Sequence, residues 1–405
     1  MLTGRGWIVA AGAVAVAVVG RMLGIFEMFL LAAGAAVLLV AALVSVRLAT
    51  VRLDGTRQLH PPRVHCGVDS RVELDLVNRG GRGTPVVTIR DPFDRGRRQA
   101  RFLVPPLRRG EAARAAYRLP TERRGVFPIG PMSATVADPF GLAARTRRIA
   151  TETELTVYPR VDPIVALPQT IGHDPHAGAD HPTAVGLAGE DFYALRAYEV
   201  GDDLRKVHWP STARLDELMI RQEEMPWQGR ATVLLDGRAG VHTAESFELA
   251  VSAAASLVAA SWRRGALVRL VSTGGLDSGF AAGAAHVEAL FETLAAIAPS
   301  HHDRVGPVLA GLRRTGNAGA LAAIVTGAIP TADLDRLARL QVRYGSLTLV
   351  VFERSSYQDE TGQLERVPAV GRLIRVTAER PFAAAWNRAM TEPAARVAGF
   401  AGWRG

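Results

Sequence analysis

Cysteine and lysine are almost absent from this chain. A single cysteine, Cys66, excludes an internal disulfide and any zinc or redox motif that needs paired cysteines. Lys206 is the only lysine and no Gly-Lys pair occurs, so the chain lacks the phosphate-binding loop of P-loop ATPases. Because nothing in the region around Cys66 looks catalytic, we interpret it as a structural thiol rather than a nucleophile.

Aromatic residues are also scarce, at 6% of the 405 residues. The 48 basic and 39 acidic side chains give a net charge of +9, which would suit nucleic acid or anionic lipid. No stretch combines a run of arginines with interleaved aromatics, so we expect no nucleic-acid partner. The length predicts two or three domains, and a hydrophobic content of 48% is too high for a disordered chain.

Charge is missing from most of the first fifty residues. Between residues 7 and 46 only Arg21 and Glu27 are charged. The run 28–46 supplies 19 uncharged positions, close to the ~20 needed to cross a bilayer. The run 6–20 is shorter, and a signal peptide is its alternative interpretation. We expect a two-helix transmembrane hairpin over residues 1–48 that contacts the lipid bilayer through residues 7–46.

The distribution of arginines around this hairpin predicts its orientation. Arg5 precedes it and four arginines follow it closely, namely Arg47, Arg52, Arg57 and Arg63. The positive-inside rule therefore places both ends of the hairpin in the cytoplasm. We expect a multi-pass protein of the cell membrane with its soluble domains in the cytoplasm, which also agrees with the single cysteine.

Residues 49–160 contain short alternating runs, such as 71–77 and 154–158, separated by turn-rich spacers every ~8–12 residues. This pattern predicts a β-sandwich. Residues 161–228 comprise a linker and a charged stretch. The linker part, 161–189, is rich in Pro, Gly, His and Asp, and its histidines have no spacing suited to holding a metal.

Residues 229–405 alternate between apolar strands and helices. Strands are expected at 231–236, 266–272, 320–326 and 346–352, with helices near 244–264, 283–298, 303–314 and 331–341. Strands buried on both faces and joined by helices predict an α/β, doubly wound, parallel sheet. Asp236 ends the first strand, where ligands bind in such sheets.

The charged stretch packs acids, arginines and aromatics around a Gly-Asp-Asp turn. Its prominent residues are Phe192, Leu195, Arg196, Tyr198, Gly201, Asp202, Asp203, Arg205, His208, Trp209, Thr212, Ala213 and Arg214. Apart from His208, they fall in register with the approximate pattern F-x-x-L-R-x-Y-x-x-G-D-D-x-R-x-I-x-W-x-x-[ST]-A-R, with Val207 in place of the isoleucine. The chain thus resembles the domain-of-unknown-function family 58 proteins.

That resemblance implies a von Willebrand factor A-like α/β domain and a partner, a MoxR-type AAA+ ATPase. Typical domains of this kind hold a divalent cation with a D-x-S-x-S run after the first strand. Here the run is Asp236, Gly237, Arg238, Ala239, Gly240. Both hydroxyls are missing and Arg238 brings a positive charge, so we expect a degenerate site without metal, at which Asp236 is only a weak residual candidate.

Three interpretations of the charged stretch remain open. In the first, its arginines pair with Asp202 and Asp203 and lock the linker to the α/β domain. In the second, Tyr198 and Trp209 form a docking surface for a protein partner. We expect a protein-interaction module, without cofactor or enzymatic activity, that assists the ATPase in assembling or maturing a protein complex. The alternative is a membrane-bound hydrolase or nuclease that uses Asp202, Asp203 and His208.

Overall fold

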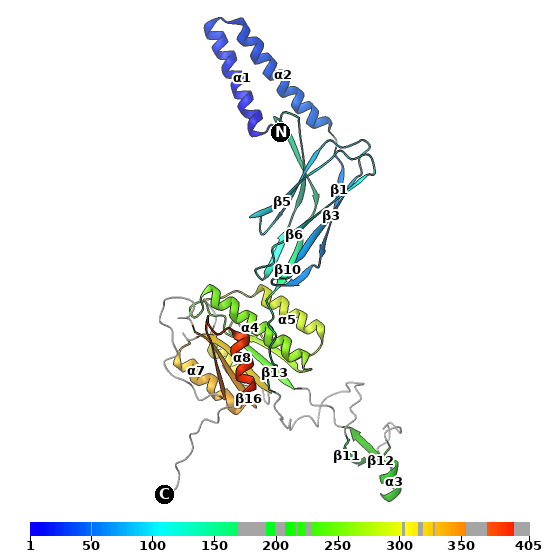
Figure 1. Ribbon diagram of the computed structural model, residues 1–405, viewed down its shortest axis with the longest axis vertical. Coiled ribbons are helices and arrows are strands. Elements are labelled where there is room, and N and C mark those ends of the chain that lie inside the picture. Colours follow the sequence, from blue (N-terminus) through cyan, green and yellow to red (C-terminus); the bar gives the residue numbers. More distant parts are fainter. Residues whose placement is uncertain are drawn as a thin grey trace. The chain divides into compact units, whose positions relative to one another are not determined.

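Figure 1 shows the computed structural model of the chain. It describes residues 1–49, 51–168, 192–198, 207–215, 217–223, 229–301, 304–314, 319–326, 329–353 and 371–392. The chain divides into two compact units. The first comprises residues 1–160 together with 291–297, and the second comprises residues 161–290 and 298–405.

Two antiparallel helices open the chain, α1 (Gly4–Leu23) and α2 (Phe26–Leu48). The side chain of Thr3 caps α1 by accepting from the Gly6 N–H, and Gly24 turns the chain in the left-handed region at φ 70°. Gly20 lets the helices approach, because a Cβ there would lie 2.8 Å from the Met28 Cβ. Both helices are long and apolar enough to cross a membrane, as the sequence predicts.

The chain start is joined to the loop before β9 (Ala144–Ala150). Leu2 forms an antiparallel bridge with Ala143, and the Thr3 hydroxyl donates to the Gly141 carbonyl oxygen at 2.6 Å. Beside it, Leu39, Ala42 and Val46 of α2 are buried in one cluster with Leu142 and Ala143. Helix α2 therefore packs directly on this part of the β-strand region.

Ten strands form the β domain, which we define as residues 53–158. Besides β9, they are β1 (Leu53–His60), β2 (Arg63–His65), β3 (Ser70–Asn78), β4 (Val87–Phe93), β5 (Arg98–Val104), β6 (Ala112–Leu119), β7 (Gly125–Ile129), β8 (Met132–Ala137) and β10 (Thr153–Tyr158). They make three sheets, ordered β1-β3-β6, β2-β10-β7 and β5-β4-β8-β9. Alternate side chains of these sheets enclose one hydrophobic core, which includes Leu74, Ile89 and Met132.

A buried polar network crosses this core. Arg57 and Asp91 form an ion pair whose side chains are 2% and 0% exposed. The Tyr117 hydroxyl donates to Asp91 Oδ2 at 2.7 Å. Burial first, and then the charge of Asp91, raise the pKa of the Tyr117 phenol. Three strands that are distant in sequence are thereby held together by groups that satisfy one another.

The charged stretch folds as two strands and a helix. Strands β11 (Phe192–Ala197) and β12 (Met219–Glu223) pair antiparallel, and α3 (Trp209–Leu215) precedes β12. Val207 bridges Ile220, and both are buried. This arrangement is more ordered than a plain linker, because it has backbone pairing and apolar contacts of its own.

The α/β domain is a five-stranded sheet whose strands are all parallel. Its elements are β13 (Arg230–Leu235), α4 (Ala244–Arg263), β14 (Leu267–Ser272), α5 (Ala284–Ala296), α6 (Val305–Arg314), β15 (Ala320–Thr326), α7 (Thr331–Ala338), η2 (Arg339–Val342), β16 (Ser346–Phe352), β17 (Arg372–Val376) and α8 (Phe382–Thr391). The strand order β14-β13-β15-β16-β17 is the 2-1-3-4-5 order of doubly wound sheets.

Helices cover both faces of this sheet, so its strands are almost entirely apolar. Helices α6 and α7 pack on one face, and α4 packs against β13, β14 and β15 on the other. The four predicted strands and the predicted helices are confirmed. Two elements, β17 and α8, were missed by the sequence prediction.

Candidate functional site

The carboxyl end of β13 is the position where a doubly wound sheet binds ligands. Strand β13 lies between β14 and β15, where the strand order reverses. Asp236 directly follows β13, Thr273 directly follows β14, and Thr326 is the last residue of β15. All three are buried, with exposed fractions of 1%, 4% and 0%. The fold thus brings one carboxylate and two hydroxyls to the same edge.

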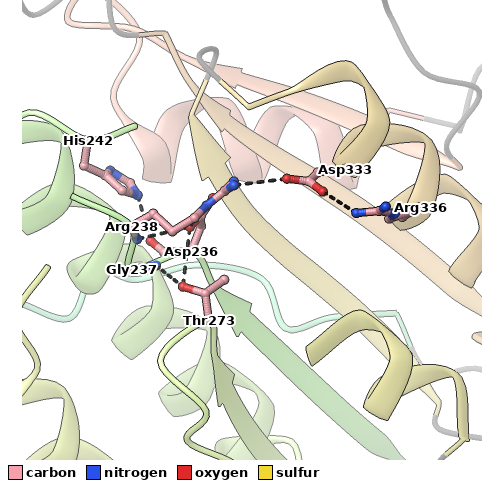
Figure 2. A network of polar contacts seen from close by, with 7 residues as sticks. All are labelled: Asp236, Gly237, Arg238, His242, Thr273, Asp333 and Arg336. Atoms are coloured by element: carbon pink, nitrogen blue, oxygen red, sulfur yellow. Dashed lines mark hydrogen bonds and ion pairs between the residues drawn. The ribbon is translucent and has the colours of Figure 1, made fainter. Parts of the chain in front are cut away.

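Arg238 binds the Asp236 carboxylate through both of its oxygens (Figure 2). The Arg238 Nε donates to Asp236 Oδ1 at 2.9 Å, and an Nη donates to Oδ2 at 2.7 Å. The Arg238 backbone N–H also donates to Oδ1, at 3.2 Å. The guanidinium matches the planar carboxylate with two parallel bonds, the strongest form of this interaction.

The same guanidinium continues to a second carboxylate on the other side. Its remaining Nη donates to Asp333 Oδ2 at 3.0 Å, and Arg336 donates to Asp333 Oδ1 at 3.0 Å. Burial alone would lower the pKa of Arg238, but hydrogen bonds and charge from Asp236 and then Asp333 outweigh it and raise the pKa. We call Asp236, Arg238, Asp333 and Arg336 the edge network.

Neighbouring groups fix the position of Asp236. The Thr273 hydroxyl accepts from the Gly237 N–H at 2.7 Å and lies 3.5 Å from Asp236 Oδ1. His242 Nε2 lies 2.7 Å from the Asp236 carbonyl oxygen, so this nitrogen carries the proton and donates. The carboxylate is therefore held by its backbone as well as by Arg238.

The Arg238 guanidinium lies where a cation bound to this carboxylate would lie. Both Asp236 oxygens are engaged by the guanidinium, which supplies one positive charge without needing a metal. The part of the chain that the structure describes contains no group of three or more His, Cys, Asp or Glu placed to hold a metal ion. The chemistry that this edge offers is an internal ion pair rather than an open coordination site.

The second candidate site lies on α3 and the residues flanking it. His208 Nδ1 lies 2.8 Å from the Ser211 Oγ, and the His208 carbonyl accepts from the Ser211 and Thr212 N–H groups. The Thr212 hydroxyl accepts from the Met219 N–H at 3.0 Å, which ties α3 to β12. Trp209, by contrast, is 66% exposed.

The structure describes only some of the remaining predicted residues. Tyr198 is half-buried and its N–H donates to the Leu218 carbonyl at 2.8 Å, while Arg214 lies exposed in α3. Arg196 lies in β11, but its side chain is outside the described residues, as are Gly201, Asp202, Asp203 and Arg205. The predicted pairing of the arginines with the Gly-Asp-Asp acids therefore stays a prediction.

Sequence reasoning missed Asp333 and Arg336. No acid occurs between the end of β15 and Pro330, so the sequence offers none directly after this strand. Asp333 lies in the first turn of α7, the helix that starts directly after β15. An acid in the first turn of a helix that begins at the ligand-binding edge was the available signal.

Comparisons with known proteins give one match to a family model and several weak structural similarities. No curated protein matches the chain. The CARDB domain of the PF1109 protein from Pyrococcus furiosus, in complex with di-metal ions, has 17% identity and a TM-score of 0.21, covering 26% of this chain and 88% of that chain. AlkC, an alkylpurine DNA glycosylase from Pseudomonas fluorescens bound to DNA, has 9% identity and a TM-score of 0.18, covering 31% and 38%.

A β-glucosidase from Listeria innocua in complex with gluconolactone has 12% identity and a TM-score of 0.18, covering 26% of this chain and 16% of that chain. At TM-scores this low, none of the three supports an inference about this chain. The charged stretch and most of the α/β domain give a clearer result. Residues 194–374, which are less than half of the chain, match the family model described as protein of unknown function DUF58, so this region is similar to that family.

Proposed function

We propose that the chain is a membrane-anchored protein-interaction module that assists a MoxR-type AAA+ ATPase in assembling or maturing a protein complex. In this proposal the hairpin α1–α2 crosses the membrane twice and the soluble domains face the cytoplasm. The absence of a phosphate-binding loop supports a division of labour, because ATP hydrolysis then comes from the partner.

The observation that carries the proposal is the exposure of Trp209. Its side chain is 66% exposed, and two further apolar residues nearby in sequence, Leu215 and Leu218, are 60% and 39% exposed. Tryptophan dominates the binding energy of many protein interfaces when a partner buries it. Trp209 and Leu215 lie on the short helix α3 and Leu218 follows it, and exposed apolar residues of this kind are suited to docking.

The edge network supports the same interpretation of the α/β domain. We interpret this domain as von Willebrand factor A-like, with Arg238 in place of the cation that such domains hold. An ion pair within the chain leaves no open coordination position for a substrate. This favours a domain that binds a protein through its surface over one that carries out chemistry at the sheet edge.

The test is partner capture by the full chain in neutral detergent, with the MoxR-type ATPase of the same genome as purified prey. We expect Trp209→Ala to weaken capture by ~2 kcal/mol or more, about 30-fold, because Trp209 loses its buried area in the complex. Trp262→Ala is the matched control, since Trp262 is also partly exposed, at 37%, but lies on α4. Both variants should melt close to the parent chain.

Two results would contradict the docking proposal. Equal capture by parent and Trp209→Ala chains would remove this surface from the interface. Failure of the parent chain to bind the ATPase at micromolar concentration, with or without nucleotide, would remove the partner. Leu215→Ala serves as a second variant on the same helix if Trp209→Ala is poorly soluble.

One contact keeps the alternative function under consideration. His208 and Ser211 lie at hydrogen-bonding distance, which is the relation of a base and a nucleophile in hydrolases. The same contact is also typical of a helix start, because Ser211 lies in the first turn of α3. Turnover of an ester or a nucleic acid that vanishes in His208→Ala, Ser211→Ala and Asp203→Ala chains, each with a normal melting temperature, would favour the hydrolase or nuclease.

The proposed topology has its own test. A reporter that fluoresces only in the cytosol should give signal when fused after Gly405, and one active only outside the cytoplasmic membrane should not. The reverse pattern would place the soluble domains outside and exclude a cytosolic ATPase as the partner.

A further inference from the structure

A pocket of about 220 Å³ lies at the end of the β domain that meets α2. Three arginines line it, namely Arg52, Arg145 and Arg147. Its apolar lining includes Val51, Ala134 and Val136. A pocket that joins several guanidinium groups to an apolar surface is suited to an amphipathic anion rather than to water alone.

Strand register explains why two of these arginines reach the pocket. In the β8–β9 pair, Arg145 lies opposite Val136 and Arg147 lies opposite Ala134. Residues directly opposite each other share a face of a sheet, and Ala134 and Val136 belong to the hydrophobic core. Strand β9 thus carries arginines at positions on the core face, where apolar residues are expected.

Both arginines are exposed, and charge on an edge strand such as β9 can protect it from pairing with another chain. That role alone needs neither a pocket nor Arg52, which comes from a different part of the chain. Among the described residues, none of the three arginines forms an ion pair. Asp138, which lies shortly before β9, accepts from the N–H groups of Phe140 and Ala143.

The pocket lies where both helices join the β domain. Ala49, which lines it, directly follows the last residue of α2. At the start of β9, the Met1 ammonium group donates to the Ala144 carbonyl oxygen at 3.0 Å. If the hairpin crosses the membrane as proposed above, this end of the β domain lies at the bilayer surface.

We propose that this pocket binds the phosphate of an anionic phospholipid from the adjoining leaflet. Guanidinium groups bind phosphate oxygens through paired N–H donors, and the apolar lining accommodates the glycerol and the first methylenes. Basic pockets beside transmembrane helices bind anionic headgroups in this way. The inference rests on the proposed membrane anchoring but not on the proposed ATPase partner.

The test uses the full chain in neutral detergent, titrated with dioleoylphosphatidylglycerol or dioleoylphosphatidylcholine. Melting temperature and native mass spectrometry report binding. We expect only the anionic lipid to raise the melting temperature and to remain bound, with an affinity that falls as salt rises. Arg145→Gln/Arg147→Gln should need at least about tenfold more lipid for the same shift.

The matched control is Arg90→Gln/Arg101→Gln, two exposed arginines that lie opposite each other on β4 and β5 of the same sheet. It should bind as the parent chain does. Equal effects of the two lipids, or equal losses in the two double variants, would overturn the site. Equal stabilisation by sn-glycerol 3-phosphate would overturn the lipid assignment and leave a site for soluble phosphate.

Arg52→Gln gives a second variant if the double variant of β9 does not fold, because Arg52 precedes β1 and is exposed. It should lower the affinity by several fold, and unchanged binding would contradict the proposal. Failure of anchoring is distinguishable, since the chain would then remain soluble after lysis without detergent. A chain recovered in membranes that shows no preference for the anionic lipid would overturn the lipid site alone.

Discussion

Two arginine–aspartate pairs in this chain have the same chemistry but are buried to different degrees. In the β domain, Arg57 and Asp91 are 2% and 0% exposed, and Arg57 also donates to the carbonyl oxygens of Ile129 and Thr151. At the sheet edge, Arg238 and Asp236 are 15% and 2% exposed. The first guanidinium has its donors satisfied inside the fold, whereas the second shares its donors with Asp333.

This difference separates a structural role from a functional position. The Arg57 pair joins strands β1 and β4, and its guanidinium also donates to two backbone carbonyl oxygens, so its groups are satisfied within the β domain. The Arg238 pair lies where doubly wound sheets bind ligands, and it continues through Asp333 to Arg336, which is 55% exposed. The first pair is thus enclosed within the β domain, whereas the second lies at a position where such sheets bind ligands.

Asp91→Ala should have the largest effect on stability. It leaves the Arg57 guanidinium buried without a counter-charge, which costs about 3–5 kcal/mol. Urea unfolding of the full chain in neutral detergent, followed by hydrogen exchange in β1 and β4, measures this loss. The double variant Arg57→Met/Asp91→Leu should recover a large part of it, because no buried charge then remains. A double variant as unstable as the single one would contradict this account.

Arg238→Ser/Gly240→Ser should come next, and it changes the response to metal as well as stability. The Asp236 carboxylate loses its partner, but water can reach the edge once the guanidinium is gone. We therefore expect the free energy of unfolding to fall by about 2–3 kcal/mol. The two serines supply neutral oxygens suited to Mg²⁺ beside the carboxylate. Millimolar Mg²⁺ should therefore raise the melting temperature of this variant by several degrees.

The parent chain is the control for that experiment. With Arg238 bound to both oxygens of Asp236, Mg²⁺ and Mn²⁺ should leave its melting temperature unchanged. A rise in the parent chain that Asp236→Ala abolishes would show that a cation displaces Arg238. The same rise in parent and variant would mean that the ion acts elsewhere.

Tyr117→Phe should have a smaller effect, since it removes one hydrogen bond to Asp91 and leaves the Arg57 pair in place. We expect a loss of about 1–3 kcal/mol at pH 7. Because the folded pKa of Tyr117 is raised, its contribution is present below the unfolded pKa of about 10 and is lost as pH rises toward the folded pKa. The gap between parent and variant melting temperatures should therefore narrow in alkali, and a constant gap would contradict this.

Local patterns predicted much of the fold. Apolar runs gave the elements of the α/β domain up to β16, because each run depends on neighbours in sequence. Strand β17 and helix α8 follow a long stretch without clear periodicity, and Trp386 of α8 is buried only through tertiary contacts such as its bond to the Val165 carbonyl. Such contacts leave no periodic signal.

The candidate site was predicted only in part. Asp236 could be placed at a strand end, and Arg238 was expected to bring a positive charge next to it. That Arg238 turns back onto Asp236 while reaching Asp333, 95 residues away, depends on how α7 lies against the sheet edge. Spacing along the sequence does not contain that information. The His208–Ser211 contact was local, yet its geometry needed the helix start to be known.

A third pair, Arg269 and Asp277, has one partner exposed to solvent. Its loss has the smallest predicted effect. Asp277 is 46% exposed while Arg269 is 6% exposed. Hydrogen bonding from Arg269, helped by the Gly279 N–H, outweighs burial and lowers the pKa of Asp277. A lowered pKa gives stability that is present above the unfolded pKa of about 4 and is lost as pH falls through the folded value.

Asp277→Asn should thus destabilise the chain at pH 7 by no more than about 1 kcal/mol, because solvent screens an exposed pair. The difference in melting temperature should shrink between about pH 5 and pH 2, as the parent carboxylate takes up a proton and comes to resemble the amide. Asp335→Asn, at an exposed carboxylate of α7, controls for the change in net charge. A difference that stays constant down to pH 2 would show that the effect comes from packing. The stabilising effect of charge pairing would then be limited to the two more buried pairs, those of Asp91 and Asp236.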